Sequence, residues 1–181
     1  AMTLEDIARV REDFVSAARR AREAGFEWLE LHFAHGYLAQ SFLSEHSNLR
    51  DDAYGGNFDN RSRFLLETLA AVREVWPEHL PLTARLGVIE YDGRDEQTLS
   101  EAIELTRRFK DGGLDLLSVS IGFTIPESNI PWAPGFMGEV TQRVRREAGI
   151  AVASAWGFGT PSVAEEAVKS GQLDLAMIGR A

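Results

Sequence analysis

Two histidines and a tyrosine stand close together in the segment LHFAHGY at residues 31–37. His32 lies at the end of an apolar run, and His35 and Tyr37 follow where the chain turns. Two neighbouring imidazole N–H groups can bind one carbonyl oxygen and stabilise negative charge on it, and a phenol can supply a proton. Two alternatives stay open, a structural role for the histidines and a metal-binding pair. A metal is disfavoured because no carboxylate at the same strand end completes a ligand set.

Arg85, in LTARLG, is a cation in a segment that otherwise runs apolar. A buried guanidinium needs an anionic or acceptor-rich partner. One candidate is an acid on a neighbouring strand, which would make Arg85 half of a salt bridge. The other is a reduced flavin ring, which carries negative charge near N1 and the C2 carbonyl.

The segments SAWGFGTPS at 154–162 and MIGRA at 177–181 are candidates for a phosphate site. The first is a glycine-rich loop that enters a helix at Pro161, with Thr160 or Ser162 available as caps. Such helix N-termini present free N–H groups to phosphate, and Arg180 adds a positive charge. Trp156 is either a core aromatic or part of a pocket wall. The loop at 123–136 is either a wall of the same pocket or a surface excursion.

Short apolar runs alternate with longer amphipathic segments along the whole chain, which predicts an α/β fold with a parallel sheet. A long polar loop covers 44–60. The predicted helices cover 3–24, 62–76, 96–111, 136–148 and 161–170, and the predicted strands cover 26–33, 80–88, 114–122, 151–157 and 173–179.

The position of the polar residues favours a (β/α)8 TIM barrel over a doubly wound open sheet. In a barrel the C-terminal ends of all strands meet at one mouth, whereas an open sheet would spread them out. These strand ends carry His32, His35, Arg85, Ser120, Trp156 and Arg180.

A (β/α)8 barrel usually needs about 250 residues, and this chain has 181. We therefore expect a single incomplete TIM-barrel domain over residues 1–181. It would contain about strands 4 to 8 with their intervening helices, with the opening β/α units and the last helix missing. An exposed sheet edge in such a piece would favour association.

The net charge of −9 opposes binding to nucleic acid. No apolar run approaches the roughly 18 residues that cross a bilayer, and no secretory signal is visible, so we expect a cytoplasmic protein without a membrane partner. The chain has no cysteine, which excludes disulfides and thiolate metal sites. We predict no metal site.

The segment LHFAHGYLAQSFLSEHSNLRDDAYGGNFDNRSRF resembles the signature segment of the Old Yellow Enzyme family of FMN-dependent NADH/NADPH oxidoreductases. LTARLG, SAWGFG and MIGRA follow at the family's intervals, so the resemblance covers essentially the whole chain. Within the family, the chain is most similar to the bacterial xenobiotic reductases through Trp156 and the SNIPW loop.

The resemblance implies that His32 and His35 bind the substrate carbonyl, that Tyr37 lies close to the proton-delivery position, and that Arg85 contacts the flavin near N1. It also implies contacts to the ribityl phosphate end of FMN and to the adjacent pocket wall from Ala155, Trp156, Gly157, Gly179 and Arg180. Asn57 departs from the more usual Ser, a change expected to matter little. The family's earlier strands, which supply further flavin contacts and in this subclass a cysteine that tunes the flavin, have no counterpart here.

The resemblance thus implies an FMN-dependent ene-reductase that uses NADPH or NADH to reduce the C=C bond of α,β-unsaturated carbonyls. Its small-molecule substrates would be enones, quinones or nitro compounds, and the full-length protein is expected to be a homo-oligomer. Two alternatives remain open, a flavin-free phosphate-binding barrel isomerase or lyase and an inactive barrel fragment.

Overall fold

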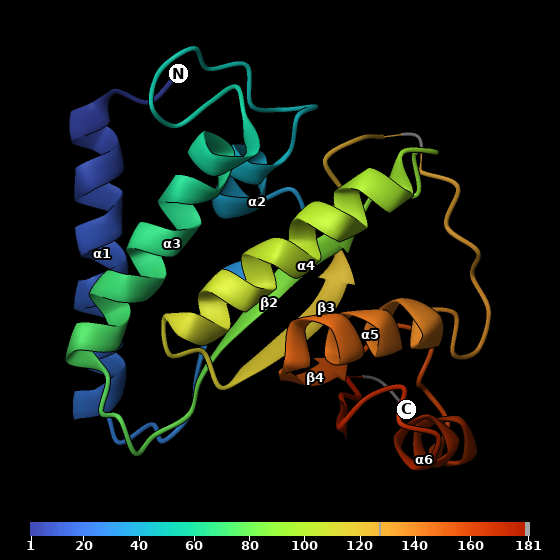
Figure 1. Cartoon of the computed structure of the whole chain (residues 1–181). Coiled ribbons are helices and arrows are strands. Elements are labelled where there is room, and N and C mark those ends of the chain that lie inside the picture. Colours follow the sequence, from blue (N-terminus) through green and yellow to red (C-terminus); the bar gives the residue numbers. More distant parts are fainter. Residues whose placement is uncertain (127, 180–181) are drawn as a thin grey trace.

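Helices and strands alternate along the chain in the computed structural model, which describes residues 1–126 and 128–179. The strands form one sheet in which all neighbours are parallel (Figure 1). They are β1 (Leu29–Phe33), β2 (Leu82–Ile89), β3 (Leu116–Ile121), β4 (Ala151–Ser154) and β5 (Leu175–Ala176). The helices are α1 (Leu4–Glu23), α2 (Leu38–Leu43), α3 (Phe58–Val75), α4 (Asp95–Asp111), α5 (Gly138–Val144), η1 (Arg145–Gly149, a π-helical turn) and α6 (Pro161–Lys169).

The strands lie in the sheet in the order β1-β2-β3-β4-β5, which is also their order in the chain. A doubly wound sheet reverses its strand order at a switch point, whereas a (β/α)8 barrel adds each strand beside the previous one. The consecutive order therefore matches part of a barrel. The predicted α/β fold with parallel strands is confirmed.

Side-chain caps fix where the first two long helices begin. Thr3 caps α1 by accepting the N–H of Asp6, whose carboxylate accepts the N–H of Thr3 in return. Asn57 caps α3 because its side-chain oxygen accepts the N–H of Asn60 at 3.0 Å. Asn and Ser are comparable N-caps, so this contact supports the expectation that Asn57 matters little, which stays a prediction.

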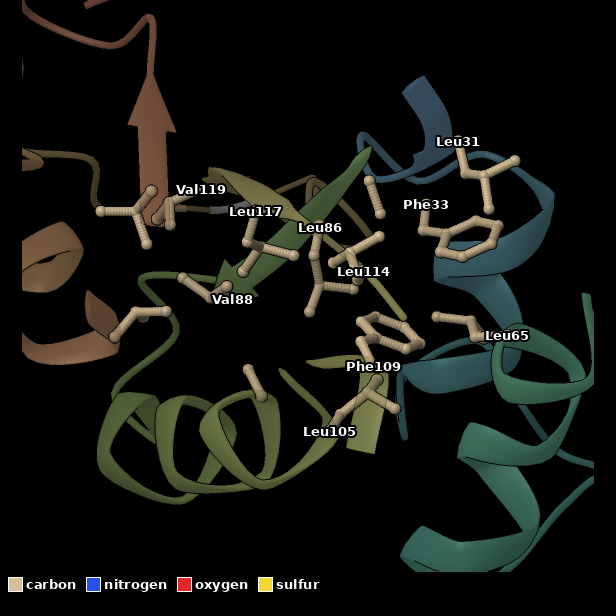
Figure 2. Close-up of a cluster of buried hydrophobic side chains, with 14 of the residues drawn as sticks. Leu31, Phe33, Leu65, Leu86, Val88, Leu105, Phe109, Leu114, Leu117 and Val119 are labelled. Carbon is tan, nitrogen blue, oxygen red and sulfur yellow. The ribbon is translucent and has the colours of Figure 1, made fainter. Parts of the chain in front are cut away.

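The core lies between the sheet and the helices on one of its faces. Alternate side chains of β1, β2 and β3 point into it, and they meet apolar side chains of α3, of α4 and of the segment that enters β3 (Figure 2). Its members include Leu31, Phe33, Leu65, Leu86, Val88, Leu105, Phe109, Leu114, Leu117 and Val119. Because these residues take one face of each strand, the residues between them must point to the other face.

Several boundaries differ from the sequence-based prediction. The strand predicted at 26–33 begins at Leu29, because Leu29 paired with Leu82 is the first residue pair of the β1–β2 register. The last strand is much shorter than 173–179, since only Leu175 and Ala176 pair with β4. The helix α2 was not predicted. The described residues include no helix with both the length and the apolar composition that a membrane crossing requires.

We expect Leu86→Ala to lower the free energy of unfolding by about 2–5 kcal/mol, because the fully buried Leu86 side chain would leave a cavity between the sheet and the helices. The matched control is Leu49→Ala, since the Leu49 side chain is 88% exposed and its loss should change stability by less than about 0.5 kcal/mol. Urea denaturation of both variants measures the difference. Equal losses would contradict this placement of the core.

Candidate functional site

The face of the sheet opposite the core carries a row of polar side chains. His32 is the register partner of Arg85, and Arg85 is the register partner of Ser118. Strand alternation therefore puts these three side chains on the same face, with Glu30 two residues before His32 on β1. His32 and Arg85, the predicted site residues that lie within strands, are therefore both on this face.

A tight turn after β1 brings the second histidine back toward the first. The N–H of Tyr37 donates to the carbonyl of Ala34 at 3.3 Å, and both residues between them are left-handed, His35 with φ 63° and Gly36 with φ 68°. This conformation is uncommon for a residue with a side chain. As a result, the His32 and His35 rings lie with their centroids 5.0 Å apart, and the Tyr37 ring lies 5.4 Å from that of His32.

Gly36 has a second reason to be glycine besides its positive φ. A Cβ at this position would lie 2.6 Å from the carbonyl oxygen of Phe123, which belongs to the loop after β3. The turn after β1 therefore packs directly on the backbone of that loop. This close approach places the histidine turn and the loop after β3 at one end of the sheet.

His35 is held by side chains from two other strand ends. Its Nε2 lies 2.7 Å from Oγ of Ser120 on β3, and the Nε1–H of Trp156, just after β4, donates to the same oxygen at 2.8 Å. The rings of Trp156 and Phe123 lie 6.1 Å and 5.9 Å from that of His35. Trp156 is half-buried and thus both packs in the structure and borders the histidine pair.

The surroundings keep both histidines in their neutral form. Burial lowers the pKa of His32, and the nearby Arg85 guanidinium lowers it further. Burial, followed by the charges of His32 and Arg85, lowers the pKa of His35 to about 4. Each imidazole is therefore neutral at ordinary pH and carries one N–H, so the pair can donate hydrogen bonds but holds no acidic proton.

Arg85 has a carboxylate neighbour on the adjacent strand. Its Nε lies 3.0 Å from Oε1 of Glu30, which is the salt bridge to a neighbouring acid that the sequence left open. Yet the buried Nε makes no hydrogen bond within the described part of the chain, because the N–H does not point at the carboxylate. The guanidinium also donates to Sδ of Met177 at 3.7 Å, a weak acceptor. Arg85 thus keeps donor capacity for an anionic or acceptor-rich ligand.

The glycine-rich loop after β4 is joined to the loop after β3. The N–H of Gly135 donates to the carbonyl of Gly157 at 2.7 Å, and a Cβ on Gly157 (φ 82°) would lie 2.8 Å from that Gly135 nitrogen. The segment at 123–136, for which a pocket wall and a surface excursion were both open, therefore packs against the predicted phosphate loop. Trp132, Phe136 and Trp156 line an open hollow there.

The predicted phosphate-binding residues lie around the start of α6. Pro161 occupies the first turn, and Thr160 stands at the N-cap but makes no side-chain cap hydrogen bond, so the first N–H groups of α6 have no side-chain cap. Ala155 and Gly179 are exposed, and a Cβ on Gly179 would meet nothing within 4 Å. Arg180 lies outside the described residues. No group of three or more metal-ligating side chains is found among the described residues.

Two residues at this site were not assigned a role from the sequence. Ser120 was placed at a strand end, but only the structure shows that it contacts both His35 and Trp156. Glu30 was missed, although a carboxylate two residues before His32 in an apolar strand must share the face of His32. That alternation was the available signal for Glu30, whereas nothing in the sequence indicates which residues Ser120 contacts.

Comparison with known proteins gives consistent matches over the whole chain. The model of the NADH:flavin oxidoreductase / NADH oxidase family matches residues 1–181. The NADPH dehydrogenase of Geobacillus thermodenitrificans (strain NG80-2) is 40% identical over 179 residues, which are 99% of this chain and 52% of that protein. The NADPH dehydrogenase of Bacillus subtilis (strain 168) is 36% identical over the same shares. The chain thus spans about half the length of the curated relatives it matches.

Solved structures agree with this result. A complex of 2-naphthoyl-CoA reductase with 2-naphthoyl-CoA superposes with a TM-score of 0.88 at 30% identity, over 98% of this chain and 28% of that one. The old yellow enzyme homologue from Zymomonas mobilis superposes with a TM-score of 0.81 at 26% identity, over 99% of this chain and 50% of that one.

The low pKa of His35 predicts how stability depends on pH. The unfolded chain binds a proton at this residue below pH 6.5, whereas the folded chain does so only near pH 4. The wild-type protein should therefore lose unfolding free energy relative to His35→Gln as the pH falls from 6.5 toward 4. Urea denaturation at several pH values measures this difference, with His79→Gln, an exposed histidine, as control. A constant difference across this range would contradict the neutral state of His35.

The Glu30 carboxylate makes the opposite prediction. Burial raises its pKa above the ordinary value of 4.5, and the opposing attraction of Arg85 is the smaller effect. An acid with a raised pKa in the folded state costs stability as the pH rises through that value. We therefore expect Glu30→Gln to gain unfolding free energy over the wild-type protein between pH 4.5 and neutral pH. The exposed Glu78→Gln serves as control, and a gain of equal size there would argue against burial as the cause.

Proposed function

Because the chain belongs to the NADH:flavin oxidoreductase / NADH oxidase family, we propose that the whole protein is an FMN-dependent ene-reductase. In this proposal NADPH or NADH supplies the reducing equivalents, and the C=C bond of an α,β-unsaturated carbonyl compound accepts them. The observation that carries the proposal is the pair of neutral histidines beside Arg85, with their ring centroids 5.0 Å apart.

The residues of this site fit a flavin. Arg85 is a half-buried cation whose Nε has no hydrogen bond within the described residues. It could therefore donate a hydrogen bond to the electron-rich N1 end of the ring. The backbone of Ala155 to Gly157 and the free N–H groups at the start of α6 suit the phosphate end. Gly179 leaves its backbone accessible on the neighbouring segment. Trp156 lies beside His35, with ring centroids 6.1 Å apart, and in this proposal borders the substrate.

Bound FMN would supply the hydride that reaches the β-carbon of the substrate. The protein's part is to hold the carbonyl oxygen with N–H groups of His32 and His35, which are strongest as negative charge develops on that oxygen. Neutral donors suit this task because they stabilise the charge without giving up their protons. In this proposal Tyr37, a residue that is 64% exposed and lies beside His32, protonates the α-carbon.

The aromatic side chains around the pair favour planar substrates. Trp132, Trp156 and Phe123 form a connected group, with ring centroids 5.7 Å apart for the first pair and 5.6 Å for the second. Planar electron-poor molecules stack on such faces. Enones, quinones and nitro compounds share this shape and fit the proposed chemistry. We further propose that the whole protein is a homo-oligomer.

We expect the purified full-length protein to show the visible absorbance of a flavin and to oxidise NADPH when an enone is added. His32→Ala and His35→Ala should each lower kcat by about 10²- to 10³-fold, the usual loss when one donor to a developing oxyanion is removed. Both variants should keep their flavin, because neither histidine is assigned to FMN binding. Anaerobic turnover and the flavin spectrum of each variant are the measurements.

The control for this experiment is His79→Ala, because His79 is exposed and precedes β2 at the opposite end of that strand from the histidine pair. Loss of flavin from His32→Ala would show that the pair has been assigned to the wrong ligand. A colourless full-length protein that cannot be reconstituted with FMN would instead favour a flavin-free barrel isomerase or lyase, with the histidines as acid and base.

A further inference from the structure

Ser120 lies at the centre of a hydrogen-bonded chain that the proposed chemistry does not yet use. Its side chain is almost fully buried, with 2% of the residue exposed, at the end of β3. Oγ contacts Nε1 of Trp156 at 2.8 Å and Nε2 of His35 at 2.7 Å. These are the only hydrogen bonds that the Ser120 side chain makes with described residues. The three residues come from three different strand ends, so this contact exists only in the folded sheet.

The chemistry of the donors fixes the direction of the first hydrogen bond. An indole nitrogen is a donor only, so Trp156 must give its proton to Ser120 and occupies one lone pair of Oγ. The serine then has one hydrogen and one further lone pair to offer to His35. The contact with Nε2 therefore runs in one of two directions, and each direction corresponds to a different tautomer of the imidazole.

The two directions differ in what they leave unsatisfied. If Nε2–H of His35 donated to Ser120, the buried serine hydrogen would find no acceptor among the described residues, at a cost of about 1–3 kcal/mol for an unmet buried donor. If the serine hydroxyl donates to Nε2, the serine hydrogen, the Trp156 N–H and Nε2 of His35 are all hydrogen-bonded. The second direction also leaves the proton of neutral His35 on Nδ1, whose N–H has no partner among the described residues.

We propose that Ser120 is a positioning residue that donates to Nε2 of His35 and so fixes the tautomer in which Nδ1–H is the free donor. The substrate carbonyl oxygen then meets an N–H on the open edge of the ring. In the other tautomer it would meet a bare nitrogen lone pair, which repels it. Trp156 supports this arrangement by occupying the second lone pair of the serine.

This inference rests on the proposed function for the identity of the ligand, but the tautomer itself does not depend on it. Burial and the nearby positive groups keep His35 neutral above about pH 4, so exactly one of its ring nitrogens carries hydrogen at neutral pH. The geometry around the ring supports a fixed orientation as well, since His32, Phe123 and Trp156 enclose it at centroid distances of 5.0 to 6.1 Å.

The experiment is a long-range ¹H–¹⁵N NMR measurement on the full-length, FMN-loaded protein with ¹⁵N-labelled histidine at neutral pH. We expect His35 of the wild-type protein to carry its proton on Nδ1. In Ser120→Ala we expect a mixture of tautomers or the Nε2–H form, together with roughly five- to tenfold weaker binding of cyclohexenone, the loss of about one hydrogen bond. The FMN content should be unchanged.

Ser118→Ala is the matched control, because Ser118 is a buried serine two residues earlier on β3 and contacts Met177 rather than His35. Its His35 tautomer should equal that of the wild-type protein. An Nε2–H tautomer in the wild-type protein would overturn the proposal, and this result needs no variant. An unchanged tautomer in Ser120→Ala, or an equal shift in Ser118→Ala, would overturn it too. A colourless protein with the Nδ1–H tautomer would instead reject the flavin function and leave the role of Ser120 standing.

Discussion

The alternation of side chains along parallel strands is the constraint on which this structure depends. Each strand must bury one face against the helices, and Leu31, Leu86 and Leu117 take that face. The residues between them have no choice but to point to the opposite side. Because the strands are in consecutive order and their register is set by the apolar face, His32, Arg85 and Ser118 align across three strands without any direct contact being required to align them.

The same alternation puts the charged side chains of Glu30 and Arg85 next to each other in a partly buried position, where water solvates them poorly. Glu30 and Arg85 lie within 3.0 Å, yet the raised pKa of Glu30 shows that burial costs this carboxylate more than the arginine returns. The ion pair is not needed to stabilise the fold, because two well-packed apolar side chains at these positions would stabilise it as much. The imperfect geometry of the Arg85 Nε, which makes no hydrogen bond within the described residues, is what one expects of a cation held ready for another ligand.

Much of this arrangement could be predicted from the sequence. The features that could not be predicted share one cause. Apolar runs and caps located the helices and strands, and the polar residues at strand ends indicated a barrel mouth. The position at a strand end indicated Ser120, but its contact with His35 joins residues that are 85 positions apart, and no local pattern predicts that contact. Likewise, only Leu175 and Ala176 of the predicted strand at 173–179 pair with β4, although the apolar run is longer. Both depend on tertiary register, which local patterns do not encode.

Burial and the charge of Arg85 together limit what the histidines can do. Burial makes a positive charge on either imidazole unfavourable, the nearby Arg85 cation adds to this effect, and the pKa values of both rings fall as a result. A histidine that must act as an acid and a base needs a pKa near the working pH, and a pKa of about 4 removes His35 from that role at neutral pH. A neutral imidazole can still donate a hydrogen bond from its one N–H, and a donor at the other nitrogen fixes which of the two nitrogens carries that hydrogen. In the proposed arrangement Ser120 donates to Nε2 of His35, and Trp156 donates to the serine oxygen. Burial, the charge of Arg85 and the hydrogen bond from Ser120 thus lead to the same result, a fixed uncharged donor. Such a donor suits the binding of a carbonyl oxygen, as the proposed function requires, and does not suit proton exchange.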